Sequence, residues 1–331
     1  MQASLIEALQ RNPHPPLATK HHQQTKPAPY GHYIPNVIFQ TDVRPPPEEE
    51  TKSWTKHGFN RVFMDDDQAM AWVEKTFAGT DIPRVFKELP LVILKADMLR
   101  YLYLLAEGGV YSDIDTRALA PISEWAQGAV SWPSGKPPTQ PVRMVVGIEG
   151  DLHVWRNWGS TYGLGFSVTG RHRNFQIAQW TIASDAHHPI LVDCIRRITD
   201  TFVVAQAWNI THYRAIEMLE AEGRWTHAHK LRLMRKPWEG DVKGERMSVQ
   251  EWTGPAAFTD AVLSYLLAVG GIREQDLYGL EQPVQVGDVV VLPTDGYNPL
   301  RETLPNPRAK AIHLFRGSWK DNWDSAVHLD D

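Results

Sequence analysis

Two aspartates one residue apart, Asp113 and Asp115, are the residues whose types and spacing most clearly suggest chemistry in this sequence. They lie in the stretch Gly108–Thr116 (GGVYSDIDT), after a glycine pair and the apolar residues Val110 and Tyr111. We expect this stretch to form a strand, in which side chains two residues apart point to the same face. Two hard oxygen ligands held together on one face suit Mn²⁺ or Mg²⁺. The pair is therefore a candidate metal site, whose remaining ligands could come from a nucleotide diphosphate.

A second acidic run, Asp65–Asp67, has a different context and a different interpretation. It opens the segment DDDQAMAWVEKTF, whose apolar residues recur at helical spacing. We expect its carboxylates to cap a helix at the positive end of the helix dipole. About one Asp-x-Asp triplet is expected by chance in a chain of this length. The spacing of Asp113 and Asp115 therefore leaves two interpretations open, a metal site and a solvated pair at a strand end.

The stretch before the aspartate pair gives the clearest helix prediction. PLVILKADMLRYLYLLAEGG (Pro90–Gly109) begins with proline, repeats apolar residues at helical spacing and ends with two glycines. Asp97, Arg100 and Tyr101 stand at i, i+3 and i+4, so they share one face of this helix. The Asp97–Arg100 pair is either a plain helix salt bridge or, beside a metal site, a pair that holds sugar hydroxyls.

A histidine near the end of the sequence, His313, could complete such a site. It begins the stretch HLFRGSWK, in which Lys320 and the backbone N–H groups around Gly317 could meet phosphate oxygens. An imidazole nitrogen is a common ligand of divalent metals. A single histidine is more often structural, and this alternative stays open.

Composition limits the kinds of function. The 331 residues carry a formal net charge of −5 and are 42% hydrophobic, which is typical of a soluble globular protein and gives no basic field to recruit nucleic acid. The single cysteine, Cys194, excludes an intramolecular disulfide and a multi-cysteine zinc site, and we expect it to be buried. No run approaches the roughly 18 apolar residues that cross a membrane. Among the 13 tryptophans, Trp180 and Trp252 could stack on sugar rings or fill the core.

Strands and helices alternate along the chain. The predicted strands are 34–41, 59–64, 110–116, 144–149, 288–294 and one that begins at Ala311, and the predicted helices include 65–77, 90–109 and 255–271, with 171–235 mostly helical. This alternation predicts an α/β fold with a mostly parallel central sheet flanked by helices, and ligands at the carboxyl ends of the strands. We expect residues 1–30, rich in Pro, His and Lys, to be a flexible stem segment and residues 31–325 to form one catalytic domain.

Taken together, these segments resemble glycosyltransferase family 32, of the fungal initiation-specific α-1,6-mannosyltransferase type. The segments that carry the resemblance, in order, are IPNVIFQT, LKADMLRYLYLLAEGGVYSDIDT, VVGIE, NFQIAQWTIASDAHHPIL, EWTGPAAFTDAV, DVVVLPT and HLFRGSWK. The resemblance implies a GT-A-like (Rossmann-like) nucleotide-sugar transferase fold, GDP-mannose as donor, Mn²⁺ or Mg²⁺, an N-glycan acceptor and the Golgi lumen. The fungal members of this family begin with a membrane anchor, which this sequence does not show.

The resemblance also implies roles for individual positions. Asp113 and Asp115 become the metal-binding motif, and His313 takes the place of a third ligand. The other implied contacts are Asp97, Arg100 and Tyr101 with the donor sugar, Gln40 and Thr41 with the base and ribose, and Gly317, Ser318, Trp319 and Lys320 with the diphosphate.

An α-linked product made from an α-linked donor implies retention at the anomeric carbon. Retention requires a carboxylate nucleophile, or a same-face substitution in which the departing phosphate deprotonates the acceptor. Glu149 and Asp260 are the candidate carboxylates, either for covalent attack or for hydrogen bonds to the substrate. Other interpretations stay open: a different donor sugar or a lipid acceptor, a metal-dependent phosphohydrolase, and an inactive glycan-binding module.

Overall fold

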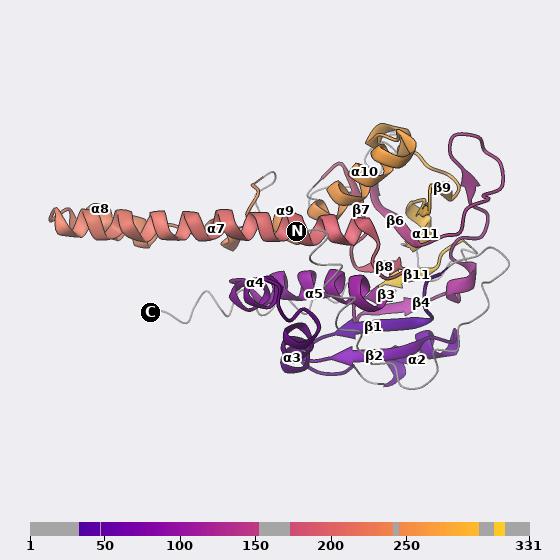
Figure 1. The fold of residues 1–331 in the computed structure, drawn as a ribbon, viewed down its shortest axis with the longest axis horizontal. Coiled ribbons are helices and arrows are strands. Elements are labelled where there is room, and N and C mark those ends of the chain that lie inside the picture. The colour runs from indigo at the N-terminus through magenta and orange to yellow at the C-terminus, as the bar shows by residue number, and fades with distance from the viewer. Residues whose placement is uncertain (1–32, 47, 152–172, 241–244, 298–307, 315–331) are drawn as a thin grey trace, which may run out of the picture.

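The computed structural model describes residues 33–46, 48–151, 173–240, 245–297 and 308–314. The predicted stem segment, residues 1–30, and the predicted diphosphate loop, Gly317 to Lys320, lie outside these residues. Within them, nine strands form one central sheet that is covered by helices on both faces (Figure 1). The strands, in spatial order, are β2 (Asn60–Met64), β1 (Val37–Thr41), β3 (Gly109–Ser112), β8 (Thr181–Ser184), β6 (Met144–Asp151), β10 (Val289–Leu292), β9 (Val284–Val286) and β5 (Val130–Ser131), with β7 (Phe175–Ile177) paired to β6.

The sheet is mixed, and the α/β class with helices around a central sheet is confirmed. Strand β1 runs parallel to β2 and β3, and β6 runs parallel to β10. Strand β8 runs antiparallel to both of its neighbours, β3 and β6. The prediction that 171–235 is mostly helical missed β7 and β8, because both strands are fully buried and so lack the alternation of polar and apolar residues that marks a half-exposed strand.

Successive residues of each strand point into two separate cores. Phe39 of β1 packs into a core shared with the helices α3, α4, α5, α7 and α10, whereas its neighbour Ile38 packs with Trp54 of α2 and Tyr297 of α11. The helices of the described residues are α2 (Glu48–Lys56), α3 (Asp66–Thr76), α4 (Ile82–Glu88), α5 (Val92–Glu107), α7 (Pro189–Ala221), α8 (Trp225–Arg232), α9 (Val249–Trp252), α10 (Pro255–Gly270) and α11 (Thr294–Tyr297). Cys194 is buried on α7, as predicted.

The acidic run at residues 65–67 caps a helix, as its sequence context predicts. The side chain of Asp65 accepts a hydrogen bond from the backbone N–H of Gln68 (2.8 Å), and the Gln68 side chain accepts one from the Asp65 backbone N–H (3.1 Å). This reciprocal capping box satisfies two donors at the N-terminus of α3. The run therefore has a structural explanation that needs no ligand.

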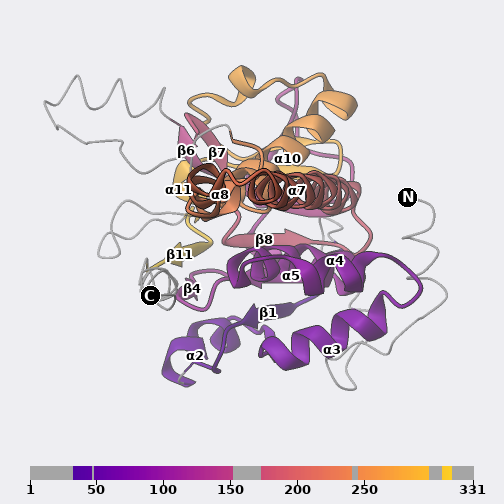
Figure 2. The same ribbon diagram turned by 90° about the vertical axis from the view of Figure 1, so that its left-hand side faces the viewer.

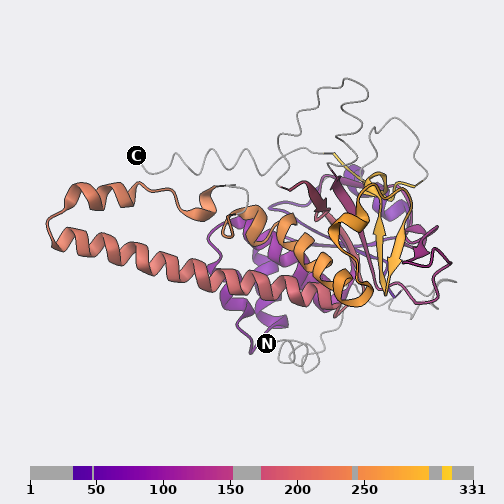
Figure 3. The same cartoon turned by 90° about the horizontal axis from the view of Figure 1, so that it is seen from above.

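Helix α7 is 33 residues long, and its second half leaves the body of the molecule. Figure 2 views α7 nearly end-on, between α10 and α5, against which its first half packs. Figures 1 and 3 show the second half projecting outward, with α8 folded back along it. Among the described residues, no helix has the length and apolar character needed to cross a membrane.

A glycine pair makes the tight connection between α5 and β3 possible. Gly108 and Gly109 both have positive φ, +68° and +101°, a region that favours glycine. A Cβ on Gly109 would lie 2.8 Å from the carbonyl oxygen of Val37, so the close approach of β3 to β1 excludes a side chain here. The pair thus fixes where the aspartates that follow β3 emerge.

We expect Gly109→Ala to lower the free energy of unfolding by about 2–4 kcal/mol, because the left-handed backbone costs roughly 1 kcal/mol and the contact with Val37 adds an overpacking cost. Urea unfolding measures this. Gly128→Ala is the matched control, since Gly128 also has a positive φ (+77°) but nothing lies within 4 Å of its Cβ position. Equal losses in the two variants would show that the close approach to β1 does not matter.

Candidate active site

The aspartate pair lies in a turn and not on a strand. Strand β3 ends at Ser112, and Asp113 to Asp115 lead into β4 (Thr116–Ala118), so the prediction that both carboxylates share one face of a strand was wrong. The physical reason is a set of local hydroxyl contacts. Thr116 donates its hydroxyl to the carbonyl of Asp113 (2.5 Å), and Ser112 donates to the Thr116 hydroxyl (2.8 Å), which folds the chain back at this point.

A two-stranded sheet brings a histidine from the end of the chain to this turn. Strand β11 (Ala311–His313) pairs antiparallel with β4, and the register places His313 opposite Thr116. The Nε2 atom of His313 lies 3.0 Å from Asp115 Oδ1 and 3.9 Å from Asp113 Oδ2. The Leu314 backbone N–H donates to the Asp115 carbonyl (2.9 Å), which holds the two segments together. The three predicted metal ligands therefore meet.

The ligand atoms of Asp113, Asp115 and His313 all lie within 4.8 Å of one another. Two carboxylates and one imidazole form a donor set that fits Mn²⁺ or Mg²⁺, with open positions for further oxygen ligands. Burial by itself would lower the pKa of His313, but its hydrogen bond to Asp115 and the nearby negative charges raise the pKa overall. The structure thus provides a partly buried cluster of two carboxylates and an imidazole in which a cation is favoured.

Trp180 packs against the imidazole ring of His313. Its ring stacks on the imidazole, with centroids 5.1 Å apart and an interplanar angle of 19°, and the tryptophan is almost fully buried. The Trp180 carbonyl accepts a hydrogen bond from the Asp113 backbone N–H (2.8 Å). The Trp180 Nε1–H is buried and has no hydrogen-bond partner among the described residues. Trp180 therefore fixes both metal-ligand segments and leaves one donor unused.

Arg100 joins the helix α5 to the aspartate turn. Its Nη2 donates to Asp97 Oδ1 (2.7 Å), and its Nη1 donates to Asp113 Oδ1 (3.3 Å). The guanidinium lies over the ring of Tyr111, 4.5 Å from its centroid, and the Tyr111 hydroxyl donates to the same Asp113 oxygen (2.6 Å). Asp97 and Arg100 are only 3% and 5% exposed. The pair predicted from helical spacing is thus a buried ion pair that extends to the aspartate motif.

Burial and the neighbouring charges change the pKa values of Arg100 and Asp97 in opposite directions. Burial alone would lower the pKa of Arg100, but Tyr111, Asp113 and Asp97 raise it overall, so the guanidinium stays charged. Burial raises the pKa of Asp97, and the charge of Arg100 and the hydrogen bond from Thr253 oppose that change. The Nε atom of Arg100 is buried without a hydrogen-bond partner among the described residues. The Nη1 and Nη2 atoms of Arg100 therefore make its contacts with the two aspartates.

Tyr101 supports this ion pair from within the core. Its hydroxyl donates to the Thr253 carbonyl (3.0 Å) and accepts from the Gln179 side chain (2.6 Å). Thr253 in turn donates its hydroxyl to Asp97 Oδ2 (2.8 Å). Tyr101 is fully buried, so in this structure it contacts the supporting residues and not open space. Gln179 and Thr253 were not predicted, because no spacing rule links them to a helix more than 70 residues earlier.

The end of β1 also contacts the aspartate turn. Gln40 is buried and donates its side-chain amide to the carbonyl of Asp113 (3.2 Å), while Arg61 donates to the Gln40 side-chain oxygen (3.0 Å). Thr41 donates its hydroxyl to the Met64 carbonyl (2.8 Å). Both predicted nucleotide-binding residues therefore sit at the carboxyl end of β1, and Gln40 is tied directly to the metal motif. Arg61 was missed, since only the parallel register of β1 and β2 places it there.

Asp42 adds another carboxylate near the pair. Burial raises its pKa, and the negative charges of Asp66, Asp115 and Asp113 raise it further. Its Oδ1 accepts from the Val43 backbone N–H (2.6 Å). Asp42 was not predicted as a site residue, because its position directly after a strand is its only signal in the sequence.

The two candidate carboxylates for retention lie in different surroundings. Glu149 accepts a hydrogen bond from the Gln176 side chain (2.6 Å), and it is close enough to His313 to raise the pKa of that imidazole. Asp260 instead accepts from Arg173 (2.5 Å) and lies 3.8 Å from Arg197. No described contact links Asp260 to the aspartate pair. The structure therefore brings Glu149, but not Asp260, toward the predicted metal ligands.

The two tryptophans named as sugar-stacking candidates are both buried. Trp252 is 1% exposed, and its Nε1–H donates to the Ile198 carbonyl (3.1 Å), so it fills the core, the alternative that the sequence left open. Trp180 lies beside His313, as described above. Only Trp180 is therefore part of the candidate site.

Comparisons with known proteins agree with this site. A family described as "glycosyltransferase sugar-binding region containing DXD motif" matches residues 38–132, which include both aspartates. The chain is similar to an initiation-specific α-1,6-mannosyltransferase of Schizosaccharomyces pombe (33% identity, 89% of this chain, 66% of the relative) and to one of Candida albicans (30% identity, 80% and 64%). It thus spans a little under two thirds of these relatives. A solved structure of the PaToxG glycosyltransferase is 13% identical, covers 72% of each chain and has a TM-score of 0.36.

We expect Arg100→Met to lower the free energy of unfolding by about 3–5 kcal/mol, because it leaves the buried carboxylate of Asp97 without its cation. Chemical denaturation measures the loss. In the double variant Asp97→Asn/Arg100→Met the uncompensated charge is also removed, so part of the stability should return. A double variant less stable than Arg100→Met alone would contradict this account of the ion pair.

Proposed function

We propose that this chain, a homologue of the initiation-specific α-1,6-mannosyltransferases, is a metal-dependent retaining mannosyltransferase with a GT-A-like fold. The resemblance to glycosyltransferase family 32 predicted this relationship. The proposed reaction transfers mannose from GDP-mannose to an oligomannose N-glycan in α-1,6 linkage, in the Golgi lumen. The observation that carries the proposal is the meeting of Asp113, Asp115 and His313 beside the buried Asp97–Arg100 pair. The cation, which would bind the donor's diphosphate, would then lie next to the residues proposed to bind the donor's sugar.

Asp113, Asp115 and His313 would hold the divalent cation, Mn²⁺ or Mg²⁺. When bound, the cation would offset the negative charge that develops on the diphosphate as the glycosidic bond breaks. The chain's own contribution is to fix the three ligands before the substrate arrives. Tyr111 and Arg100 hold the Asp113 carboxylate, the β4–β11 pairing holds His313, and the Trp180 ring limits the rotation of the imidazole.

Asp97 and Arg100 are the proposed contacts to the donor sugar. The position of Arg100 Nη1 beside Asp113 supports this role, because it places the guanidinium next to the proposed cation site. Tyr101 positions this pair through Thr253 and Gln179 and is not itself proposed to touch the sugar. Gln40 and Thr41 are proposed for the base and ribose, and Gly317, Ser318, Trp319 and Lys320 for the diphosphate.

Glu149 is the carboxylate that we propose to face the sugar. It accepts a hydrogen bond from Gln176, and it lies close enough to His313 to raise the pKa of that imidazole. Asp260 is neutralised by Arg173, which also pairs with Glu251, so we assign it a structural role. Retention then proceeds by same-face substitution: the C1–phosphate bond breaks, the acceptor oxygen bonds to C1 from that side, and its proton passes to the departing phosphate. A substrate hydroxyl that donates a hydrogen bond to Glu149 would hold the ring in place during this step.

Incubation with Mn²⁺ and GDP-mannose tests the proposal. Release of GDP that depends on an oligomannose acceptor supports transfer, release of inorganic phosphate indicates a phosphohydrolase, and binding without turnover indicates a glycan-binding module. We expect Asp115→Ala to reduce transfer by about two orders of magnitude or more, since several kcal/mol of charge stabilisation are lost, while the melting temperature changes little. Asp67→Ala, in the exposed acidic run, is the matched control and should keep full activity. Full activity of Asp115→Ala would contradict the metal assignment.

The affinity for Mn²⁺ should fall as the pH is lowered. The nearby carboxylates hold the pKa of His313 above its usual 6.5, so the imidazole is protonated, and unable to bind a metal, at pH values near and below 6.5. Isothermal titration of Mn²⁺ between pH 5.5 and 8 measures the change. His313→Ala should bind more weakly and lose most of this pH dependence, whereas His229→Ala, on the exposed surface of α8, should behave as the unmodified chain. An unchanged pH profile in His313→Ala would rule out the histidine as a ligand.

A further inference from the structure

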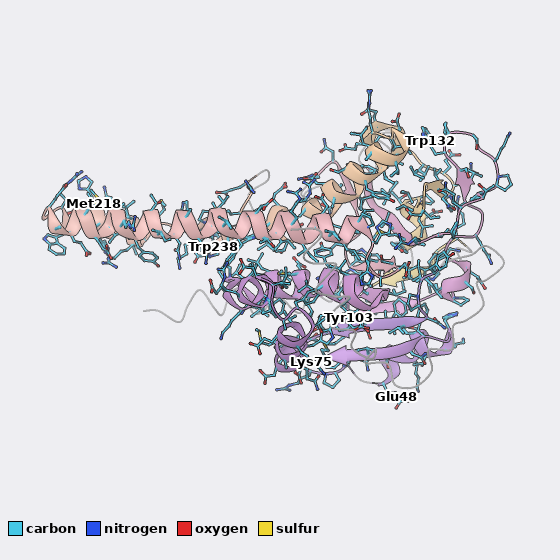
Figure 4. All side chains as sticks on the ribbon, viewed as in Figure 1. Glu48, Lys75, Tyr103, Trp132, Met218 and Trp238 are labelled. Atoms are coloured by element: carbon cyan, nitrogen blue, oxygen red, sulfur yellow. The ribbon has the colours of Figure 1, made fainter. Side chains whose placement is uncertain are left out.

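The projecting part of α7 together with α8, residues 209–236, forms a helical arm that stands away from the body of the protein. The arm begins beyond Trp208, whose ring packs edge-on against Trp238 with centroids 5.4 Å apart. Figure 4 labels Trp238 at this root and Met218 at the outer end. Glu220 of α7 and Arg232 of α8 pair across the arm at 2.7 Å, which holds the two helices together.

The hydrophobic core does not explain this arm. Of residues 209–236, all of them described, only Ile216 and Ala228 are buried. Ordering a residue costs about 1–2 kcal/mol of backbone entropy, and two small buried contacts return little of that cost. The arm therefore adds surface to the protein and almost no core.

The surface that the arm exposes is unusually apolar for a projecting element. Trp225, His229 and Leu233 stand at i, i+4 and i+8, so they form one ridge along α8. Trp225 is 65% exposed and Leu233 is 72% exposed. Met218 and Met234 are also exposed at this end. Large exposed apolar side chains gathered on one element mark an interaction site.

The same segment is positively charged. Residues 224–238 contain five Lys and Arg, two His and no Asp or Glu: Arg224, Lys230, Arg232, Arg235, Lys236, His227 and His229. Three of the cations pair with glutamates, Arg224 with Glu222, Arg232 with Glu220 and Lys236 with Glu239. Lys230 and Arg235 have no ion pair within the described part of the chain. Lys230 lies on α8 next to the apolar ridge, and Arg235 follows the end of the helix.

We propose that the arm binds the surface of an anionic lipid bilayer, with Trp225 and Leu233 at the level of the headgroups and Lys230 and Arg235 against the lipid phosphates. Trp225 and Lys230 lie on α8, and Leu233 and Arg235 follow directly after it. Such a mixture of tryptophan, aliphatic and basic side chains on one exposed segment is typical of segments that lie in a membrane interface. A second copy of the chain is the less favoured occupant, since the cationic segment of one arm would face that of another. The charge of the segment thus selects an acidic surface.

The position of the arm suits this role. Figures 1 and 3 show the arm extending from one side of the body, while β4 and β11, which carry the candidate active site, lie at the other side. Contact through the end of the arm therefore leaves the aspartate turn open to a substrate. The contact is peripheral, and it is independent of the proposed reaction.

Cosedimentation with lipid vesicles tests the proposal. The chain should bind vesicles of phosphatidylcholine and phosphatidylserine, should bind pure phosphatidylcholine weakly, and should be released by high salt. We expect Trp225→Ala/Leu233→Ala and Lys230→Glu/Arg235→Glu each to weaken binding by about tenfold or more. The matched controls are Val92→Ala/Leu267→Ala, exposed apolar residues of the body, and Lys87→Glu/Lys136→Glu, exposed lysines of the body. These controls should bind as the unmodified chain does.

A second measurement covers the case in which an arm variant fails to fold. The natural Cys194 is buried, so an environment-sensitive fluorophore attached to Leu233→Cys reports on the arm alone. Its emission should shift to shorter wavelength when anionic vesicles are added. The proposal is overturned if the unmodified chain ignores anionic vesicles, if the arm variants bind like the controls, or if the label does not respond. Loss of a dimer in the arm variants, seen by light scattering without vesicle binding, would instead identify a second copy as the partner.

Discussion

The buried guanidinium of Arg100 ties the rest of the candidate site together. It lies between Asp97, on its own helix, and Asp113, beyond the next strand, so one cation sets the distance between α5 and the turn that carries the aspartate pair. Withdrawing such charges from water costs several kcal/mol for each ion, and the neighbouring hydrogen bonds from Thr253 and Tyr111 help to make that burial tolerable. The cost favours this geometry, because the contacts of Arg100 with Asp97 and Asp113 compensate the buried charges.

Around this centre, several carboxylates lie close together. Burial raises the pKa of Asp42 and the charges of Asp115 and Asp113 add to it, while the hydrogen bond to Asp115 and the nearby carboxylates raise the pKa of His313. A folded protein gains no stability from like charges placed close together. Such a cluster makes physical sense where a cation binds, and His313 adds a nitrogen ligand to the two carboxylates.

The parts of this structure that follow from local rules could be predicted from the sequence. The helix α5, its glycine ending, the capped helix α3 and the spacing of Asp97 and Arg100 depend on neighbours within a few residues. The turn at Asp113 could not, since the hydroxyl of Thr116 overrode an apolar pattern typical of a strand. Nor could Gln179, Thr253 or Arg61, whose roles exist only after distant strands and helices pack. For α7 and α8, the sequence predicted helices but not a projecting arm, because the residue pattern does not change at Trp208, where the arm leaves the body.

The two-stranded sheet of β4 and β11 has a consequence for the order in which the protein is made. Asp113 and Asp115 leave the ribosome long before His313, because β11 follows them by almost two hundred residues. While synthesis continues, the aspartate turn exists without its histidine and without the backbone hydrogen bond from Leu314. The nascent chain therefore carries an incomplete cation site that closes only when the last described strand docks. The three ligands of the candidate site meet only when β11 pairs with β4. By then, all the strands of the central sheet have been synthesised.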